Sequence, residues 1–505
     1  MALNLLKPLA ICLICLLPYA GCFGQDDGTE EEKSAKPEVI VKTDSIDGKI
    51  KRLLGHIDGA YYLLVKKGLR PAYSIVSYTD TLTKLRSAPV FSFKNAYNRH
   101  NRFEKVLLTR NKLILFTTQR LKIDGSTTKN ITFAETLSPN NLQPVKRDSI
   151  TSIRHSRKEP VLGKYIIISP DSSKIGLVQF QKTGIKNILR CTVRVYDNEL
   201  NLMWGNYRDI HCSKQCINRQ DENSFYSNDN NHTESVKAQL NNEGYVFILS
   251  PNPDLLDEVV YDADTIKYYF YTYSNSGTVK ELGINGYDGN TIDMMDFYYR
   301  NDSIVFSGIC SKMTPGPTFS FRKFNFVYVP QGTFLYKYNL AADTIEKLLV
   351  TNISVLNNAS ALYQFINAGE EGNIVLMVGA HHLKDNPIPD IGEAYGPDKI
   401  IAVKRSNAGE ITCMADVLPI YDEMYNWLGF YQNGYVYVIF NYFGKTYMVT
   451  TSPDCQVEDT EIISKHKIRT EQFGLGKDMG NDVFLYVQKN AKKRTYSFIK
   501  IESGY

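Results

Sequence analysis

The sequence lacks the features that mark several large classes of protein. Its 58 Lys and Arg residues nearly balance 54 Asp and Glu residues, and the formal net charge of +4 gives no electrostatic basis for nucleic-acid binding. Only 2 Trp and 10 Met occur, whereas 34 Tyr, 24 Phe and 33 Gly favour strands and turns. Sustained helical periodicity is missing outside residues 45–54, which excludes an alternating βαβ architecture. At 505 residues, the chain needs several domains or one large ring of repeated units.

Recognisable catalytic motifs are also missing. The sequence contains neither a G-x-S-x-G elbow nor an H-E-x-x-H motif. Gly444, Lys445 and Thr446 resemble the end of a phosphate-binding loop, but Ile439 stands where the first glycine of that loop would be. We therefore assign no catalytic residue and predict no cofactor, while enzymatic activity stays open.

The N-terminal 24 residues have the pattern of a secretory signal peptide. Residues 1–7 carry positive charge, and the apolar run at 8–20 is too short to span a membrane. Cleavage before Cys22 would follow Tyr19, Ala20 and Gly21, which resemble a bacterial lipoprotein box except that Tyr19 replaces an aliphatic residue. Cleavage after Gly24 would instead release a soluble protein. The sequence thus predicts export, with a lipid on Cys22 as the only expected membrane attachment.

Residues 25–45 form an acidic, polar stretch with almost no aromatic side chains. Such a stretch cannot bury enough apolar surface to fold, so we predict a disordered tether. An acidic stretch directly after a lipidated cysteine resembles the surface-export signal of Bacteroidota lipoproteins. This resemblance implies an outer-membrane lipoprotein, and the soluble alternative would be periplasmic or extracellular. Residues 46–505 would then be the folded part.

Cysteine is too scarce in this folded part to make a disulfide scaffold, since only six residues remain beyond the signal region. Cys212 and Cys216 are close enough in sequence to form a local disulfide, and free thiols are the alternative. A zinc site would need a second pair of ligands at matching spacing, and none lies nearby. We predict no metal site.

An internal repeat is the strongest signal in the sequence. A strand that is apolar on both faces recurs seven times behind a turn signal, as expected for a strand between two neighbouring sheets. Its positions are marked by Leu113, Ile175, Val246, Ile304, Ile374, Val436 and Val483. A hairpin follows in several units, and a short strand precedes them. Four strands per unit and seven units predict an all-β fold, a β-propeller with seven four-stranded blades. Two stacked β-sandwiches are the alternative.

One unit carries a resemblance to known propellers. Residues 168–175 resemble the S-P-D-x-x-x-I phrase of TolB-type propellers through Ser169, Pro170, Asp171 and Ile175. Together with the hairpin at 195–204, this phrase resembles uncharacterised exported propeller-like proteins of Bacteroidota. The resemblance covers residues 103–505 and implies the propeller fold, but it supplies no catalytic residues.

Ring closure follows from the C-terminal unit, which supplies only three strands, at 471–477, 483–489 and 494–501. A propeller must protect the edge that this leaves open. We predict that an N-terminal strand, from residues 60–67 or 71–78, completes the last blade.

The predicted binding face carries the connections between second and third strands and those between blades, because these are long and functional residues concentrate on long loops. Its candidate residues are Asp229, His232, Arg322, Lys323, Phe324, His381, His382 and Asp385. The alternative is that the aromatic and basic residues around Arg322 belong to a blade strand and that the others lie in solvated loops.

These observations favour a non-enzymatic propeller of the cell envelope that binds a protein partner or assembles an envelope complex. The alternative is a glycan-binding or glycan-active propeller with acidic residues at the ring centre. A pocket with two close carboxylates would favour the glycan function, whereas a flat apolar patch would favour a protein partner.

Overall fold

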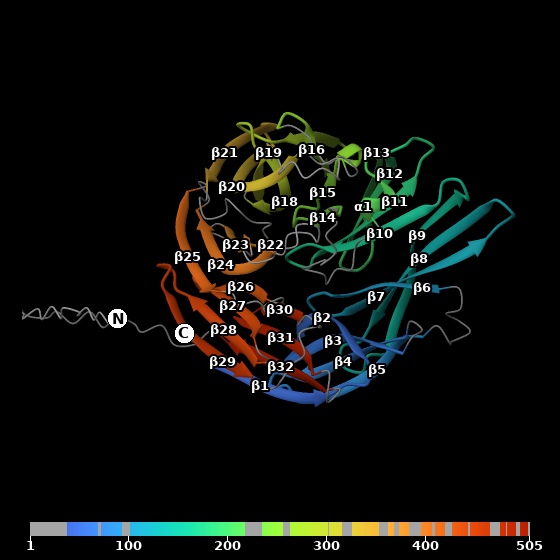
Figure 1. Cartoon of the computed structure of the whole chain (residues 1–505). Coiled ribbons are helices and arrows are strands. Elements are labelled where there is room, and N and C mark those ends of the chain that lie inside the picture. The colour runs from blue at the N-terminus through green and yellow to red at the C-terminus, as the bar shows by residue number, and fades with distance from the viewer. Residues whose placement is uncertain are drawn as a thin grey trace, which may run out of the picture.

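The computed structural model describes residues 38–502, apart from residues 69–71, 93–100, 218–234, 256–262, 301, 316–325, 353–361, 368–372, 383–394, 407–409, 420–426, 443–444, 465–474, 481 and 491–494. Within this part of the chain, eight antiparallel four-stranded sheets are arranged around a central axis (Figure 1). The predicted fold class, an all-β propeller of four-stranded blades, is confirmed.

Four blades come from the N-terminal half of the described chain. They contain β2 (Lys49–Ile57), β3 (Ala60–Lys67), β4 (Ala72–Thr79) and β5 (Lys84–Ser92); β6 (Asn101–Leu108), β7 (Leu113–Lys122), β8 (Thr127–Leu137) and β9 (Pro144–Ser156); β10 (Val161–Ile168), β11 (Lys174–Lys182), β12 (Ile188–Asp197) and β13 (Leu202–His211); and β14 (Lys237–Leu240), β15 (Val246–Pro251), β16 (Ile266–Tyr273) and β17 (Val279–Asn285). Two short helical turns, α1 (Lys214–Ile217) and the 3₁₀ turn Pro253–Leu255, lie in the connections.

The other four blades complete the ring. They contain β18 (Thr291–Arg300), β19 (Ser303–Pro315), β20 (Phe326–Asn339) and β21 (Thr344–Asn352); β22 (Leu362–Asn367), β23 (Asn373–His382), β24 (Tyr395–Arg405) and β25 (Ile411–Pro419); β26 (Trp427–Gln432), β27 (Tyr435–Tyr442), β28 (Lys445–Thr451) and β29 (Val457–Ser464); and β30 (Leu475–Gly480), β31 (Val483–Asn490), β32 (Thr495–Glu502) and β1 (Glu38–Ser45). Contacts between β30, β2, β6 and β10 show that the first strand of each of these blades is the innermost one.

The apolar second strands form the core between blades. All six residues of β15 are buried, and the first six residues of β3 are buried as well. Both faces of such a strand are covered by neighbouring blades, which explains the run of apolar residues without alternation. Each buried Val, Leu, Ile or Phe side chain contributes about 1.5–3 kcal/mol. The repeated strand is therefore the main source of cohesion in the ring.

Turn chemistry fixes the register of the hairpins. Asn433 and Gly434 join β26 to β27 with φ angles of 49° and 86°, and Asp58 and Gly59 join β2 to β3 with 47° and 72°. Two consecutive positive φ angles define the type I′ turn, whose twist matches that of the flanking strands. Asn-Gly and Asp-Gly sequences adopt this turn at low cost because glycine has no Cβ.

Lysine side chains connect neighbouring blades. Lys164 on β10 donates from its Nζ atom to Oγ1 of Thr118 (2.6 Å) and Oγ1 of Thr132 (2.5 Å) on the preceding blade. Lys237 on β14 donates to the carbonyl oxygen of Met295 (2.9 Å) on the following blade. Burial lowers the pKa of Lys164 to about 8, because the charged form loses water.

The ring is closed by an N-terminal strand, as predicted, but this strand comes from a different segment of the chain. An N-terminal strand does complete the last blade: β1 pairs with β32, from Glu38 opposite Glu502 to Ser45 opposite Thr495. The prediction that residues 60–67 or 71–78 supply this strand is wrong, because they are β3 and β4 and already have neighbours on both edges. Glu38–Ser45 had been assigned to the disordered tether, whose remaining residues lie outside the described part of the chain.

The wrong assignment of the closing strand also explains why one blade too few was predicted. Residues 60–67 and 71–78 had been considered only as candidates for the closing strand, yet both belong to a complete four-stranded sheet formed by residues 49–92. The described chain thus contains eight sheets rather than the seven units counted from the marker strands. Residues 45–54, where helical periodicity had been noted, contribute to β1 and β2. No helix of the described residues is long and apolar enough to cross a membrane.

Candidate functional site

Most of the predicted binding-face residues lie outside the described part of the chain. This applies to Asp229, His232, Arg322, Lys323, Phe324 and Asp385, and also to Cys22. His381 and His382 end β23, opposite Gly396 and Tyr395. The structure therefore leaves the predicted loops untested, and the candidate site has to be sought among the described residues.

On the predicted binding face, hydrogen bonds and ring stacking attach the described connections near α1 to the next blade. Nδ2 of Asn187 donates to Oδ1 of Asp254 (2.6 Å), and the ring of His211 stacks on Tyr269 with centroids 4.3 Å apart. The hydroxyl of Ser250 donates to the carbonyl oxygen of His211 (2.8 Å). Because these polar groups bind one another, this region is a rigid part of the scaffold.

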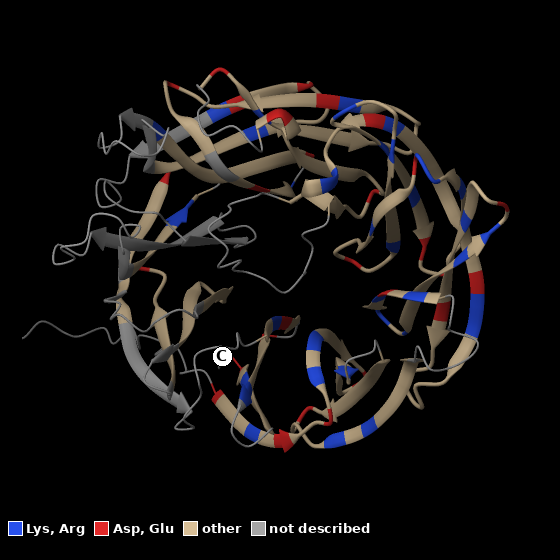
Figure 2. Cartoon of the chain, turned by 45° about the vertical axis from the view of Figure 1, so that its right-hand side comes forward, with Lys and Arg blue, Asp and Glu red and all other residues tan. Residues whose placement is uncertain are grey.

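The inner strands near the ring closure are basic (Figure 2). The charged residues of β30, β2 and β6 are Lys49, Lys51, Arg52, Arg102, Lys105 and Lys477, against Glu104 and Asp478. Lys477 donates from Nζ to the carbonyl oxygen of Leu54 on the neighbouring blade. Burial, together with the nearby charges of Arg52 and Lys105, lowers the pKa of Lys477 to about 8. These three inner strands do not provide the acidic centre that a glycan-active propeller was expected to have.

The cysteines pair differently from the prediction. Cys212 and Cys216 are free thiols, and both are buried in a core cluster with Val193, Ile210 and Tyr271. They pack as small apolar side chains, and the hydroxyl of Ser213 lies 3.4 Å from Sγ of Cys216. The predicted Cys212–Cys216 disulfide is therefore wrong. No cluster of three or more His, Cys, Asp or Glu side chains suited to a metal occurs among the described residues.

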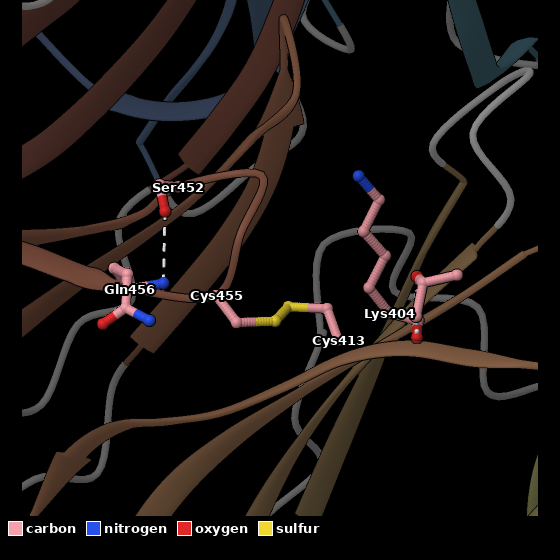
Figure 3. The surroundings of a disulfide bond; sticks show 6 residues. Lys404, Cys413, Ser452, Cys455 and Gln456 are labelled. Atoms are coloured by element: carbon pink, nitrogen blue, oxygen red, sulfur yellow. Dashed lines mark hydrogen bonds between the residues drawn. A yellow bond between two sulfur atoms is a disulfide. The ribbon is translucent and has the colours of Figure 1, made fainter. Parts of the chain in front are cut away.

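A disulfide joins two blades instead. Cys413 on β25 bonds to Cys455 in the turn between β28 and β29, with Cα atoms 5.6 Å apart (Figure 3). This distance lies within the usual range for a disulfide. The Nζ atom of Lys404 lies 5.3 Å from the centroid of the Tyr431 ring and adds a cation–π contact between the same blades. Sequence alone did not suggest this pair, because 42 residues separate the two cysteines.

The most prominent exposed patch lies on the outer strand β13. Leu202, Met203 and Tyr207 have 58%, 51% and 64% of their surfaces exposed, an unusual concentration of large apolar side chains on one strand. Met203 is the extra residue of a bulge in β13, because Val195 pairs with Trp204 and Tyr196 with Leu202. Further along the same exposed strand, Arg190 of β12 lies beside Tyr207, with its guanidinium carbon 5.5 Å from the Tyr207 ring centroid. We call Met203, Tyr207, Arg190 and Asp209 the β13 rim patch.

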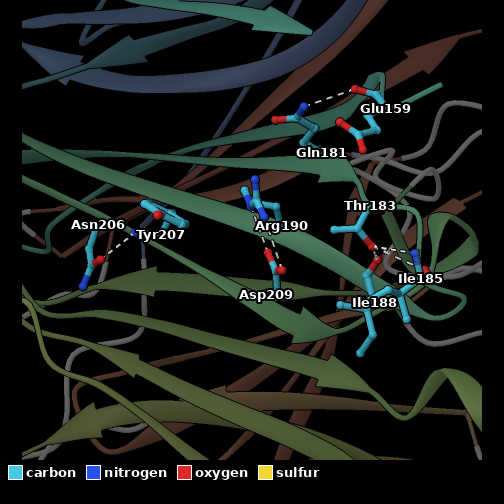
Figure 4. Close-up of polar contacts among 9 residues, drawn as sticks. All are labelled: Glu159, Gln181, Thr183, Ile185, Ile188, Arg190, Asn206, Tyr207 and Asp209. Atoms are coloured by element: carbon cyan, nitrogen blue, oxygen red, sulfur yellow. Dashed lines mark hydrogen bonds and ion pairs between the residues drawn. The ribbon is translucent and has the colours of Figure 1, made fainter. Parts of the chain in front are cut away.

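The charged members of the β13 rim patch hold each other in place (Figure 4). Nε of Arg190 donates to Oδ1 of Asp209 (2.9 Å), and this bond raises the pKa of Arg190. The intervening residues face the next blade, where Asn206 donates to the carbonyl oxygen of Gly277 (2.6 Å) and Arg208 to that of Val279 (2.8 Å). The strand under the patch is thus anchored, and the patch is a preformed surface.

The β12–β13 hairpin was recognisable in the sequence as a repeat element and as part of the resemblance to exported propellers, but it was not predicted to be a binding surface. The sequence did contain a sign of an exposed apolar surface, because the last strand of this unit carries three large apolar residues, Leu202, Met203 and Tyr207. An outermost strand has no further sheet to cover it, so apolar side chains there are exposed unless a partner covers them.

Comparisons with known proteins concern the overall fold alone. The β-propeller domain of the Trilobed protease from Pyrococcus furiosus is 12% identical over 80% of this chain and 93% of that chain, with a TM-score of 0.35. Cobalt-substituted Synechocystis ACO is 13% identical over 86% and 95% (TM-score 0.37), and prolyl oligopeptidase B from Galerina marginata is 9% identical over 90% and 56% (TM-score 0.36). No family model and no curated protein sequence matches the chain.

Proposed function

We propose that this chain is a non-enzymatic, exported β-propeller of the cell envelope that binds a protein partner through the β13 rim patch. The observation that carries the proposal is the exposure of Met203 and Tyr207 beside the Arg190–Asp209 ion pair. Tyr, Arg and Met are enriched in protein interfaces, and Tyr and Arg often dominate their binding energy. A rigid strand also loses little conformational entropy on binding.

Two features support the exported location. The Cys413–Cys455 disulfide would persist in an oxidising compartment, whereas cytosolic reductants keep most thiols free. The N-terminal signal pattern with Cys22 agrees with this location and with a lipid anchor in the outer membrane.

The patch favours a protein partner over a glycan. An exposed surface with large apolar side chains is typical of protein interfaces, whereas glycoside hydrolysis generally needs two close carboxylates. The patch contains one carboxylate, Asp209, and it is paired with Arg190. The inner strands β30, β2 and β6 are likewise mainly basic, and their two acids, Glu104 and Asp478, lie on different blades.

Quantitative affinity purification from detergent-solubilised envelopes tests the proposal. The tagged native chain is compared with a Met203→Ala/Tyr207→Ala variant and with a Val457→Ala control, which removes an exposed apolar side chain from the outer strand of another blade. We expect an envelope protein to be recovered at near-stoichiometric ratio with the native chain and the control, and at least tenfold less with the double variant.

Equal recovery with all three proteins would contradict the assignment to the β13 rim patch. Recovery of the chain alone would contradict a protein partner, and a carbohydrate binding panel would then be the next experiment.

A further inference from the structure

Arg405 is a fully buried cation with most of its donors unused. Its exposed fraction is 0%, and it lies at the end of β24 between two blades. Nη2 donates to the carbonyl oxygen of Thr333 on β20 (2.9 Å), but Nε and Nη1 have no hydrogen-bond partner. Among the described residues, no carboxylate forms an ion pair with it. A buried charge without a counter-charge is strongly unfavourable.

The sheet face that contacts this guanidinium carries buried hydroxyl groups without partners. Thr333 itself is fully buried, and its Oγ1 atom has no partner. Ser307 and Ser311 lie two residues to either side of Ile309, which is paired with Thr333, so strand alternation places them on the same face. Their hydroxyls are also buried and without partners. The space between the two blades therefore receives hydrogen-bond donors from Arg405 and from this face of the sheet.

The charge on Arg405 is not neutralised by the nearby thiol. Burial raises the pKa of Cys310 to about 11, so the thiol is uncharged at neutral pH. Burial also lowers the pKa of Arg405 to about 10, which still leaves the guanidinium charged at pH 7. The site thus combines a positive charge with neutral donors.

Arg208, another arginine between two blades, shows how such a charge is usually compensated. Arg208 on β13 also donates to a carbonyl oxygen of the next blade, that of Val279. It lies 3.4 Å from Oε2 of Glu281 and is partly exposed to water. Arg405 makes the same kind of main-chain contact, but it is fully buried and has no carboxylate partner among the residues that the structure describes.

We propose that a small inorganic anion of the halide class, such as chloride, is bound between the two blades by Nε and Nη1 of Arg405 and the hydroxyl of Thr333. A halide needs space similar to that of a water molecule, about 30 Å³. Water could satisfy the same donors, but it would leave the buried charge without a counter-ion. The anion would be taken up when the blades pack together.

Thermal unfolding at constant ionic strength tests the site, with sodium gluconate replaced stepwise by sodium chloride or bromide. Ligand that binds only the folded state stabilises it in proportion to the logarithm of its concentration. We expect the unfolding temperature to rise by several degrees with either halide. Arg405→Met should abolish this rise, and Arg208→Met, the matched control with its own carboxylate partner, should retain it.

Bromide soaking of crystals of the native protein gives a test that needs no variant to fold. An anomalous peak within hydrogen-bonding distance of Nε and Nη1 of Arg405 would support the site, and Thr333→Val should weaken that peak. Absence of a peak together with a halide response that is the same in Arg405→Met would overturn the proposal. In that case water occupies the site.

Discussion

Two junctions hold the ring together by different physical means. At one, β1 and β32 join the two ends of the described chain through a ladder of eight residue pairs. At the other, a single bond between Cys413 and Cys455 ties two successive blades. The ladder distributes its stabilisation over many weak contacts in the folded state. The disulfide acts mainly by restricting the unfolded chain.

This difference gives the junctions different sensitivities. Loss of one contact in the ladder leaves its neighbours in place, and no step depends on the redox state. Loss of the disulfide removes its whole contribution at once, and a reducing compartment would prevent it from forming. The β1–β32 ladder is therefore insensitive to the redox state of the compartment, whereas the Cys413–Cys455 disulfide forms only under oxidising conditions.

Deletion of residues 38–45 should produce the largest effect. It would remove the ladder with β32 and the hydrogen bond from the Tyr78 hydroxyl to Oδ2 of Asp44 (2.8 Å). Eight ladder bonds at about 0.5–1 kcal/mol each correspond to a loss on the order of 4–8 kcal/mol. We expect a much lower urea midpoint and aggregation through the exposed edge of β32, measured by fluorescence and size-exclusion chromatography. Lys42→Ala, at an exposed position of β1, is the control and should behave like the native chain.

Loss of the disulfide should have the next largest effect. Opening a loop of 42 residues is expected to cost about 4 kcal/mol in the chain-entropy description. Guanidinium unfolding should show this loss in the native protein when dithiothreitol is added. Cys413→Ser should start at the lower stability and show no response to the reductant. If the native protein and Cys413→Ser respond alike, the inter-blade disulfide is wrong.

A buried lysine offers a third kind of junction, which pH can weaken without breaking a bond. The pKa of Lys164 is about 8 in the folded protein, below its unfolded value of 10.5. The unfolded chain therefore holds more protons between about pH 8 and 10.5, and the free energy of unfolding contributed by Lys164 rises with pH across this window. Lys164→Met should remove that rise, and the difference between the two proteins should change by about 2–3 kcal/mol from pH 8 to pH 10.5.

Urea unfolding at several pH values measures this difference. The comparison with a variant is needed because burial raises the pKa of Tyr196 to about 12, so tyrosine ionisation lowers stability above pH 10 in both proteins. Lys67→Met, whose side chain is 40% exposed, is the control and should keep the native slope. An unchanged slope in Lys164→Met would contradict the assigned pKa.

The smallest effect is expected from a single contact of the closing junction. Tyr78→Phe would remove the hydrogen bond to Asp44 but keep the aromatic packing against Phe498. We expect a loss of about 1 kcal/mol, because water can solvate the partly exposed carboxylate of Asp44. A loss as large as that from deleting residues 38–45 would show that the closing contacts are not distributed.

Local patterns explain most of what could be predicted. The apolar second strands and the Asn-Gly turn at Asn433 depend on residues close in sequence, so the blade pattern and the all-β class were visible. The last two strands, predicted at 483–489 and 494–501, match β31 and β32, whereas the strand predicted at 471–477 lies at 475–480 as β30. The eighth blade was missed because residues 60–67 and 71–78 were considered only as candidates for the closing strand, not as strands of a blade of their own.

The sequence by itself determined the four-stranded repeat, since strand periodicity and turn chemistry act over a few residues. Tertiary structure decided which strand closes the ring, which cysteines pair and which apolar side chains stay exposed. Glu38–Ser45 pairs with β32 from the opposite end of the described chain, and the Cys413–Cys455 bond joins two different blades, so neither contact depends on residues close in sequence. Arg405 shows the same dependence, because its burial results from the contact between two blades rather than from its neighbours in sequence.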